Sequence, residues 1–162
     1  MGLQTRAAVS DVFSPEKRSE VMGRVRGKNT GPELRVRKLL WRLGARYRLH
    51  RRDLPGSPDV AMPGRRLAVF VHGCFWHGHS CPRGARKPRQ NADYWRAKLE
   101  RNQERDAAAR AALEARGWRV ETMWECELRD GPALEERLRR LLASSPPGSP
   151  RPAGRRASRP RG

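Results

Sequence analysis

The sequence predicts an α/β sandwich with a mixed β-sheet, because the spacing of apolar residues changes from helical to strand-like and back along the chain. The run Leu67–Val71 is continuously apolar and rich in β-branched residues, as in a central strand buried on both faces. Residues 92–116 have the pattern of a long helix, which Gly117 ends. Shorter helices and strands before and after these two segments complete the expected order.

Two helices are expected before the first strand. Ser14, followed by a proline, predicts a helix from residue 14 to about residue 23 with Ser14 as its N-cap. Thr30 and Glu33 form a capping box that begins a second helix, and Gly44 ends it. Within this helix, apolar residues recur at the spacing of one face, at Val36, Leu39, Leu40 and Leu43.

The remaining elements follow from turn residues and periodicity. Strands are expected at residues 46–49 and 59–62, with turns at residues 55–58 and 63–64. Residues 72–91 have no regular pattern, whereas residues 118–124 alternate and end the sheet. A terminal amphipathic helix at residues 132–142 has one leucine face, made by Leu134, Leu138, Leu141 and Leu142.

The domain organisation follows from length and composition. A chain of 162 residues has room for one core. We expect a flexible leader at residues 1–13, a single domain at residues 14–144 and a disordered tail at residues 145–162. The tail is rich in proline and arginine and has no acidic residue, so it cannot bury a core. It either adds phosphate contacts or is dispensable.

The charge balance indicates a polyanionic partner. Lysine and arginine number 36 against 17 acidic residues, a formal net charge of +19. Nucleic acid is the expected partner, because neutralised phosphates release counterions on binding. Arginine-rich usage from a GC-rich genome would explain the excess of arginine over lysine but not the shortage of acids. No signal peptide or membrane-length apolar segment is visible, so we expect a cytoplasmic protein without a membrane partner.

A dense cluster of histidine and cysteine occupies residues 72–81. It holds Cys74 and Cys81, and Cys126 can join them from beyond the next strand. Three cysteines and one histidine form a tetrahedral set typical of structural zinc, with His77 or His79 as the histidine. The alternative is three buried thiols and surface histidines.

Asp59 stands at the head of one strand, beside the end of the strand Leu67–Val71. A carboxylate there suits Mg²⁺, which takes one or two carboxylates together with water and phosphate oxygens. His72 and His77 follow closely enough for either to act as a general base. Taken alone, an aspartate before a strand is more often a turn residue.

Aromatic residues form a third signal. Phe75 and Trp76 are adjacent in the cysteine-containing loop, and Trp95 begins the long helix. Exposed aromatics on a basic protein can wedge between base steps or stack on unpaired bases. The alternative for Trp95 is that it packs the helix onto the sheet, as expected for Trp118 and Trp124.

The motif HGCFWHGHSC, preceded by PGSPDV and followed by NQERD and GWRVETMWEC, resembles the very short patch repair endonucleases. The resemblance spans about residues 14–142. It implies a restriction-endonuclease-like fold, a three-layer sandwich with a mixed central β-sheet flanked by helices and one structural zinc. It also implies a monomer associated with the nucleoid that nicks double-stranded DNA 5′ to the thymine of a T·G mismatch, which arises from 5-methylcytosine deamination.

The resemblance also implies residue roles. Asp59 matches the metal-binding catalytic carboxylate, and His72 and His77 match the active-site histidines, with His77 as general base. Glu33 and Asp106 match supporting acids. The implied zinc ligands are Cys74, His79, Cys81 and Cys126, and the implied DNA-contacting residues are Met22, Phe75, Trp76 and Trp95.

One position departs from the family pattern. Val71 stands where the family has a hydroxyl residue. If this position serves Mg²⁺ through its backbone carbonyl, valine is compatible with activity, and if the hydroxyl takes part, lower activity is expected. The basic tail and the high arginine content also depart and bear on sequence specificity. Other mismatch-repair proteins are expected as partners. The alternative functions are a zinc-stabilised DNA-binding module and a restriction-type nuclease without mismatch preference.

Overall fold

The computed structural model describes Ser14 and residues 28–144. The helix expected at residues 14–23, apart from Ser14 itself, lies outside the described residues. Met22, the leader at residues 1–13 and the tail at residues 145–162 also lie outside them.

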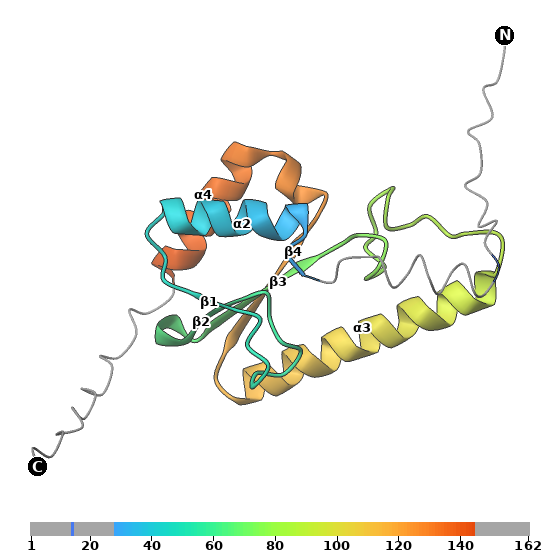
Figure 1. Ribbon diagram of the computed structural model, residues 1–162, viewed down its shortest axis with the longest axis horizontal. Helices are drawn as coiled ribbons and strands as arrows, with labels where there is room; N and C mark the ends of the chain where they lie inside the picture. Colours follow the sequence, from blue (N-terminus) through green and yellow to red (C-terminus); the bar gives the residue numbers. More distant parts are fainter. Residues whose placement is uncertain (1–13, 15–27, 145–162) are drawn as a thin grey trace, which may run out of the picture.

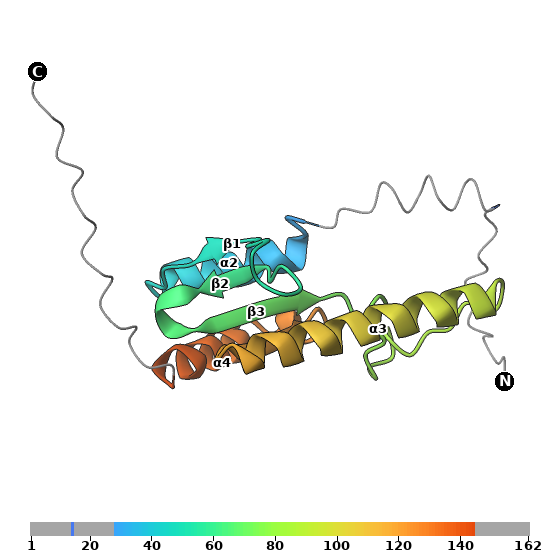
Figure 2. The ribbon, with the colours of Figure 1, turned by 90° about the horizontal axis from the view of Figure 1, so that it is seen from below.

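The described chain forms three layers around one mixed sheet (Figures 1 and 2). The strands are β1 (Arg48–Leu49), β2 (Val60–Met62), β3 (Leu67–His72) and β4 (Arg119–Trp124), in the order β1-β2-β3-β4. The first three pair antiparallel, and β3 and β4 pair parallel. The expected α/β sandwich with a mixed sheet is therefore confirmed.

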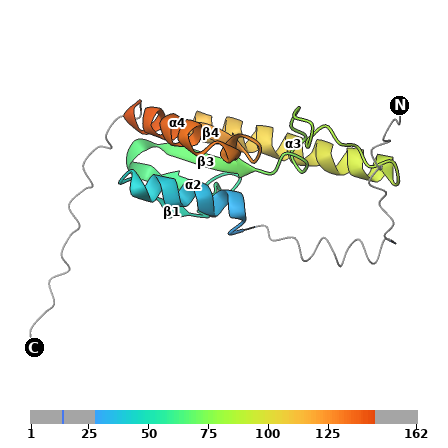
Figure 3. The ribbon, with the colours of Figure 1, turned by 90° about the horizontal axis from the view of Figure 1, so that it is seen from above.

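Helices cover both faces of the sheet. Helices α2 (Gly31–Arg42) and α4 (Gly131–Ala143) lie on one face, and α3 (Ala92–Ala115) lies on the other (Figure 1). Figure 3 shows the molecule from the side of α2 and α4. Two short 3₁₀ turns, η1 (Pro63–Arg65) and η2 (Glu127–Arg129), complete the described elements. The turn expected at residues 63–64 is thus a 3₁₀ turn that begins at a proline.

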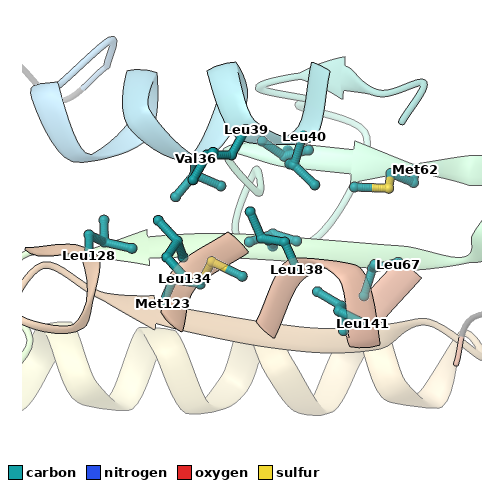
Figure 4. Packing of buried hydrophobic residues seen from close by; sticks show 12 residues of the cluster. Val36, Leu39, Leu40, Met62, Leu67, Met123, Leu128, Leu134, Leu138 and Leu141 are labelled. Atoms are coloured by element: carbon teal, nitrogen blue, oxygen red, sulfur yellow. The ribbon is translucent and has the colours of Figure 1, made fainter. Parts of the chain in front are cut away.

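The main core lies between the sheet and the α2–α4 layer. Figure 4 shows side chains of both helices directed at the sheet residues beneath them. The buried residues of this main core are Val36, Leu39, Leu40, Val60, Met62, Leu67, Val69, Met123, Leu128, Leu134, Leu138 and Leu141. On the opposite face, Ala68 packs with Leu113 of α3. Strand β3 is therefore covered on both faces, as its apolar run predicts.

Strand β4 does not show the expected alternation, since only Met123 of its residues is buried. Its polar side chains are instead paired with the helices on each side. Glu121 contacts Arg137 of α4, and Thr122 accepts a hydrogen bond from Arg110 of α3. Helices contact both faces of β4, so each face is partly covered and polar and apolar residues need not alternate.

Helix α3 extends well past the sheet (Figures 1 and 2). Only Trp95, near its start, and Leu113, near its end, are buried. Leu113 meets the sheet, whereas Trp95 lies beside the irregular loop 73–91. The helix thus supports the loop as well as the sheet. Within the described residues, no helix is both long and apolar enough to span a bilayer.

Candidate active site and cysteine–histidine cluster

The sequence-predicted site residues gather at one end of the sheet. Strand β2 begins there, while β1 and β3, each antiparallel to β2, end there. Strand β4 runs parallel to β3 and ends at the same edge. The loop 73–91 leaves from this edge, and the first turn of α2 lies above it (Figure 1).

Asp59 lies just before β2 and is hydrogen-bonded across to β3. Its Oδ2 accepts the backbone N–H of Val71 at 2.7 Å. Burial is the main cause that raises the pKa of Asp59 to about 6. The nearby carboxylate of Glu33 acts in the same direction, and the Val71 hydrogen bond acts against it. A partly buried carboxylate with one free oxygen, close to a second carboxylate, is a suitable position for a hard cation.

Glu33 both caps α2 and belongs to this site. The Thr30 half of the capping box is confirmed, because Thr30 Oγ1 accepts the backbone N–H of Glu33 at 3.4 Å, whereas the reciprocal half is not formed. The carboxylate reaches back to the backbone N–H of Asn29 at 3.0 Å rather than to that of Thr30. It is almost fully buried and forms an ion pair with Arg37 at 2.7 Å. Glu33 is therefore held in place before any ligand arrives.

His50 was missed by the sequence reasoning, and the structure places it between Glu33 and Asp59. Its Nδ1 lies 3.9 Å from Asp59 Oδ1, and its Nε2 lies 3.8 Å from Glu33 Oε2. Ligand atoms of these three residues all lie within 4.8 Å of one another. Burial and the guanidinium of Arg37 lower the pKa of His50, so its imidazole is neutral near pH 7. The available signal was the antiparallel hairpin, which sets the end of β1 beside Asp59.

A second group joins the two predicted active-site histidines to α3. The rings of His72 and His77 are stacked, with centroids 3.8 Å apart and planes 6° apart. Asp106 lies 2.5 Å from His77 Nδ1 and 3.9 Å from His72 Nδ1. Burial and the neighbouring His77 lower the pKa of His72 to about 4. His72 is the last residue of β3 rather than lying beyond that strand.

The predicted catalytic residues thus fall into two adjacent groups. Glu33 and Asp59 group with His50, whereas Asp106 groups with His72 and His77. The two groups are electrostatically connected, because the charge of His77 acts against the burial that raises the pKa of Asp59. A cavity of about 360 Å³ opens beside His72, His77 and Asp106 between α3 and β4.

The third group contains the four residues proposed to bind zinc. Ligand atoms of Cys74, His79, Cys81 and Cys126 lie within 4.8 Å of one another. His79 belongs to this group, whereas His77 turns to Asp106. Three sulfurs and one imidazole are the donor set that suits tetrahedral zinc.

The electrostatics of this group also suit a cation. Burial raises the pKa of Cys74 to about 12, and a hydrogen bond with His79 lowers the pKa of Cys81 to about 6. A buried thiol becomes a thiolate only when a positive charge compensates it. The loop is tightly folded here, since a Cβ on Gly84 would come within 2.0 Å of the carbonyl oxygen of His79.

The aromatic residues of the loop pack on α3. The ring of Trp95 lies 5.6 Å from that of Phe75 and 6.1 Å from that of Trp76. Phe75 and Trp76 are half-buried, and Trp95 is 8% exposed. The alternative that Trp95 packs the helix onto the sheet is therefore wrong, because its neighbours belong to the loop. Lys98 lies 5.8 Å from the Trp76 ring, so a cation accompanies the aromatic cluster.

Two amides of α3 fix the loop backbone, and the sequence reasoning did not single them out. Asn102 donates to the carbonyl of Trp76 at 2.8 Å, and Gln103 donates to the carbonyl of His77 at 3.3 Å. These bonds hold the segment between the two histidine groups against the helix.

Comparison with known proteins agrees with this architecture. Residues 10–83 match the family model described as DNA mismatch endonuclease Vsr. The chain is 55% identical over 137 residues to the type II nicking enzyme V.XorIIP of Xanthomonas oryzae pv. oryzae, covering 85% of this chain and 100% of that relative.

Two further relatives show the same relationship. The type II nicking enzyme V.NmeAIP of Neisseria meningitidis is 42% identical over 134 residues, covering 83% of this chain and 95% of the relative. The DNA mismatch endonuclease Vsr of Escherichia coli is 36% identical over 135 residues, covering 80% of this chain and 86% of the relative. The chain belongs to the very short patch repair endonuclease family and is a DNA endonuclease.

Proposed function

We propose that the enzyme nicks one strand of duplex DNA 5′ to the thymine of a T·G mispair by Mg²⁺-dependent hydrolysis, and so initiates very short patch repair. The observation that carries this proposal is that Asp59 and the His72–His77–Asp106 group lie at the same end of the sheet, beside an aromatic loop. The Escherichia coli relative is a DNA mismatch endonuclease, which supports the choice of substrate.

Asp59 is proposed to hold Mg²⁺ together with the backbone carbonyl of Val71. The bound ion would stabilise the negative charge that develops on the phosphate. Asp59 is prepared for this role because the Val71 N–H fixes Oδ2 and leaves Oδ1 free. Val71 has no side-chain oxygen, but a backbone carbonyl needs none, so valine is compatible with the role.

His77 is proposed as the general base. Asp106 accepts a hydrogen bond from the protonated Nδ1 of His77 at 2.5 Å. The lone pair of His77 Nε2 is then free to take a proton from the attacking water. The stacked His72, whose pKa lies at about 4, is neutral at physiological pH and does not compete for that proton. Glu33 and Asp106 then act as supporting acids, each on a different side of the site.

Phe75, Trp76 and Met22 are proposed to recognise the mispair by wedging beside it, with Trp95 as a further aromatic contact. The rings of Phe75, Trp76 and Trp95 form one cluster, and an ammonium group lies near its face. Unstacking a base step is least costly where pairing is already weak, so a rigid aromatic wedge favours a mismatch over a paired step. The aromatic cluster therefore favours base steps of the DNA that unstack easily.

The cluster Cys74–His79–Cys81–Cys126 is proposed to bind a structural Zn²⁺ that stiffens the loop. With DNA as substrate, we propose that the enzyme works as a monomer in the cytoplasm at the nucleoid. Other mismatch-repair proteins remain its proposed partners.

The test is a panel of duplexes that carry T·G or T·A at one position with varied flanking pairs. We expect one nick, 5′ to the thymine, only with T·G and only when Mg²⁺ is present. Equal nicking of T·G and T·A duplexes would identify a restriction-type nuclease without mismatch preference. Binding without nicking in Mg²⁺ would contradict the proposed catalytic site.

A further inference from the structure

We propose that His50 is a positioning residue for the catalytic metal site. Arg37 fixes the tautomer of His50, and the Nδ1–H of His50 orients the free oxygen of Asp59. This inference rests on the proposed function, since it concerns the carboxylate proposed to hold Mg²⁺. It adds a histidine that directly follows β1, and a second residue of α2, to a site otherwise assigned to Glu33 of α2, Asp59 before β2, and residues of β3 and α3.

The tautomer of His50 follows from its contact with Arg37. Arg37 Nη2 lies 2.8 Å from His50 Nε2. A guanidinium can only donate hydrogen bonds, so Nε2 of His50 must be the acceptor. In a neutral imidazole the remaining proton is then on Nδ1. Nδ1 is the atom that faces Asp59 Oδ1, at 3.9 Å.

This protonation excludes His50 as a direct metal ligand while the Arg37 contact is intact. Metal binding needs an imidazole lone pair, and the lone pair of His50 is already engaged by Arg37. The distance of 3.9 Å exceeds a hydrogen bond but lies within the reach of a small side-chain rotation. Hydrogen bonds in a site without ligand are often long and shorten once the ligand is bound.

Arg37 is buried and joins His50 to Glu33 and Asn29. It is 7% exposed and also contacts Glu33 at 2.7 Å and Asn29 Oδ1 at 2.6 Å. Among the described residues, its Nε is the buried side-chain nitrogen that has no hydrogen-bond partner. A buried cation with an unsatisfied donor destabilises a fold, which is expected where the group has a functional role.

The backbone of His50 points to the same conclusion. His50 has φ of +45°, a left-handed conformation that five described non-glycine residues adopt and that histidine tolerates better than most. Its N–H donates to the carbonyl of Asp59 at 3.5 Å, so the two residues are connected through both main chain and side chain. Strain of this kind persists where the surrounding contacts define the conformation.

Three substitutions distinguish the roles of the two ring nitrogens of His50. His50→Asn keeps a donor near the position of Nδ1 and loses the acceptor for Arg37. His50→Gln keeps an acceptor near the position of Nε2 and loses the donor toward Asp59. His50→Phe removes both, and Arg52→Gln, at a neighbouring exposed position, is the matched control.

The measurement is Mn²⁺ binding to the full-length, zinc-loaded protein without DNA, followed by electron paramagnetic resonance, with a thermal melt for each variant. We expect His50→Phe and His50→Gln to weaken Mn²⁺ binding about tenfold, as for other residues that orient metal ligands. His50→Asn should stay within about twofold of the wild type. Unchanged binding in His50→Phe, or equal losses in His50→Asn and His50→Phe, would overturn the inference.

Further readouts distinguish a positioning role of His50 from a role as metal ligand, and from failure of the proposed function. Nitrogen coupling to bound Mn²⁺ that is present in the wild type and lost in His50→Phe would make His50 a ligand and overturn its positioning role. Mn²⁺ binding that does not depend on Asp59 would overturn it as well. If the wild type binds Mn²⁺ through Asp59 yet does not nick a T·G duplex, the proposed function fails, while the Mn²⁺ affinities still decide the role of His50.

Discussion

His77 Nδ1 and the carboxylate of Asp106 lie 2.5 Å apart, and this contact connects the loop after β3 to the middle of α3. A carboxylate in this position fixes which imidazole nitrogen carries the proton and holds the ring in one orientation. The same carboxylate lies 3.9 Å from His72, so one acid serves both stacked rings.

Asp106→Asn should lower the nicking rate by between about tenfold and 10³-fold, because an amide can donate to Nδ1 and stabilise the wrong tautomer. Duplex affinity should change little, since the carboxylate is bound to the ring of His77. Single-turnover nicking of an end-labelled T·G duplex and fluorescence anisotropy measure the two quantities. Glu104→Gln, an exposed acid on the same helix, is the control and should match the wild type.

Asp59→Asn should abolish nicking and stabilise the metal-free protein at pH 8. The folded pKa of about 6 lies above the usual 3.8, so Asp59 favours the folded state below pH 4 and loses this contribution as the pH rises through 6. Asparagine does not ionise, and its carbonyl oxygen can still accept the Val71 N–H. The gain should therefore be between about 1 and 3 kcal/mol at pH 8 and close to zero at pH 4.

Urea unfolding of the metal-free proteins at pH 4, 6 and 8 checks this stability prediction. The matched variant is Asp53→Asn, because Asp53 is exposed and pairs with Arg51 outside the site. A gain for Asp59→Asn that is the same at all three pH values would show that the effect is not one of ionisation.

Cys126→Ser should lower the zinc content below the single ion expected per chain, because Cys126 brings the fourth ligand from beyond β4. Loss of a ligand frees the loop, so the melting temperature should fall by about 5 °C or more. Metal analysis and a thermal melt measure the two effects. Ser80→Ala, at an exposed position in the same loop, should change neither, and a stable wild-type protein without zinc would contradict the assignment.

Phe75→Ala should reduce the preference for T·G over T·A by about tenfold, the equivalent of one lost stacking contact. Its ring packs edge-on against Trp76 and Trp95, so the substitution also loosens the remaining cluster. Fluorescence of 2-aminopurine placed beside the mispair should show less unstacking on binding. Trp41→Ala removes a 75% exposed aromatic from α2 and serves as the control, with discrimination unchanged.

The sequence by itself determined the elements whose signals are local. The capping box of Thr30 and Glu33 predicts the start of α2 correctly, and Gly117, with φ of +74°, marks the end of α3 as expected. The continuous apolar run of β3 predicts coverage on both faces, which the two helix layers provide. These signals depend on neighbours within a few residues, so a single sequence contains them.

Only the tertiary structure decided which polar groups face one another. His50 carries no local signal, and it reaches Asp59 only because β1 and β2 pair antiparallel. Trp95 joins the loop rather than the sheet because α3 runs past the end of the strands. Such pairings depend on strand register and helix length acting over long sequence separations, where periodicity gives no information about which side chains meet.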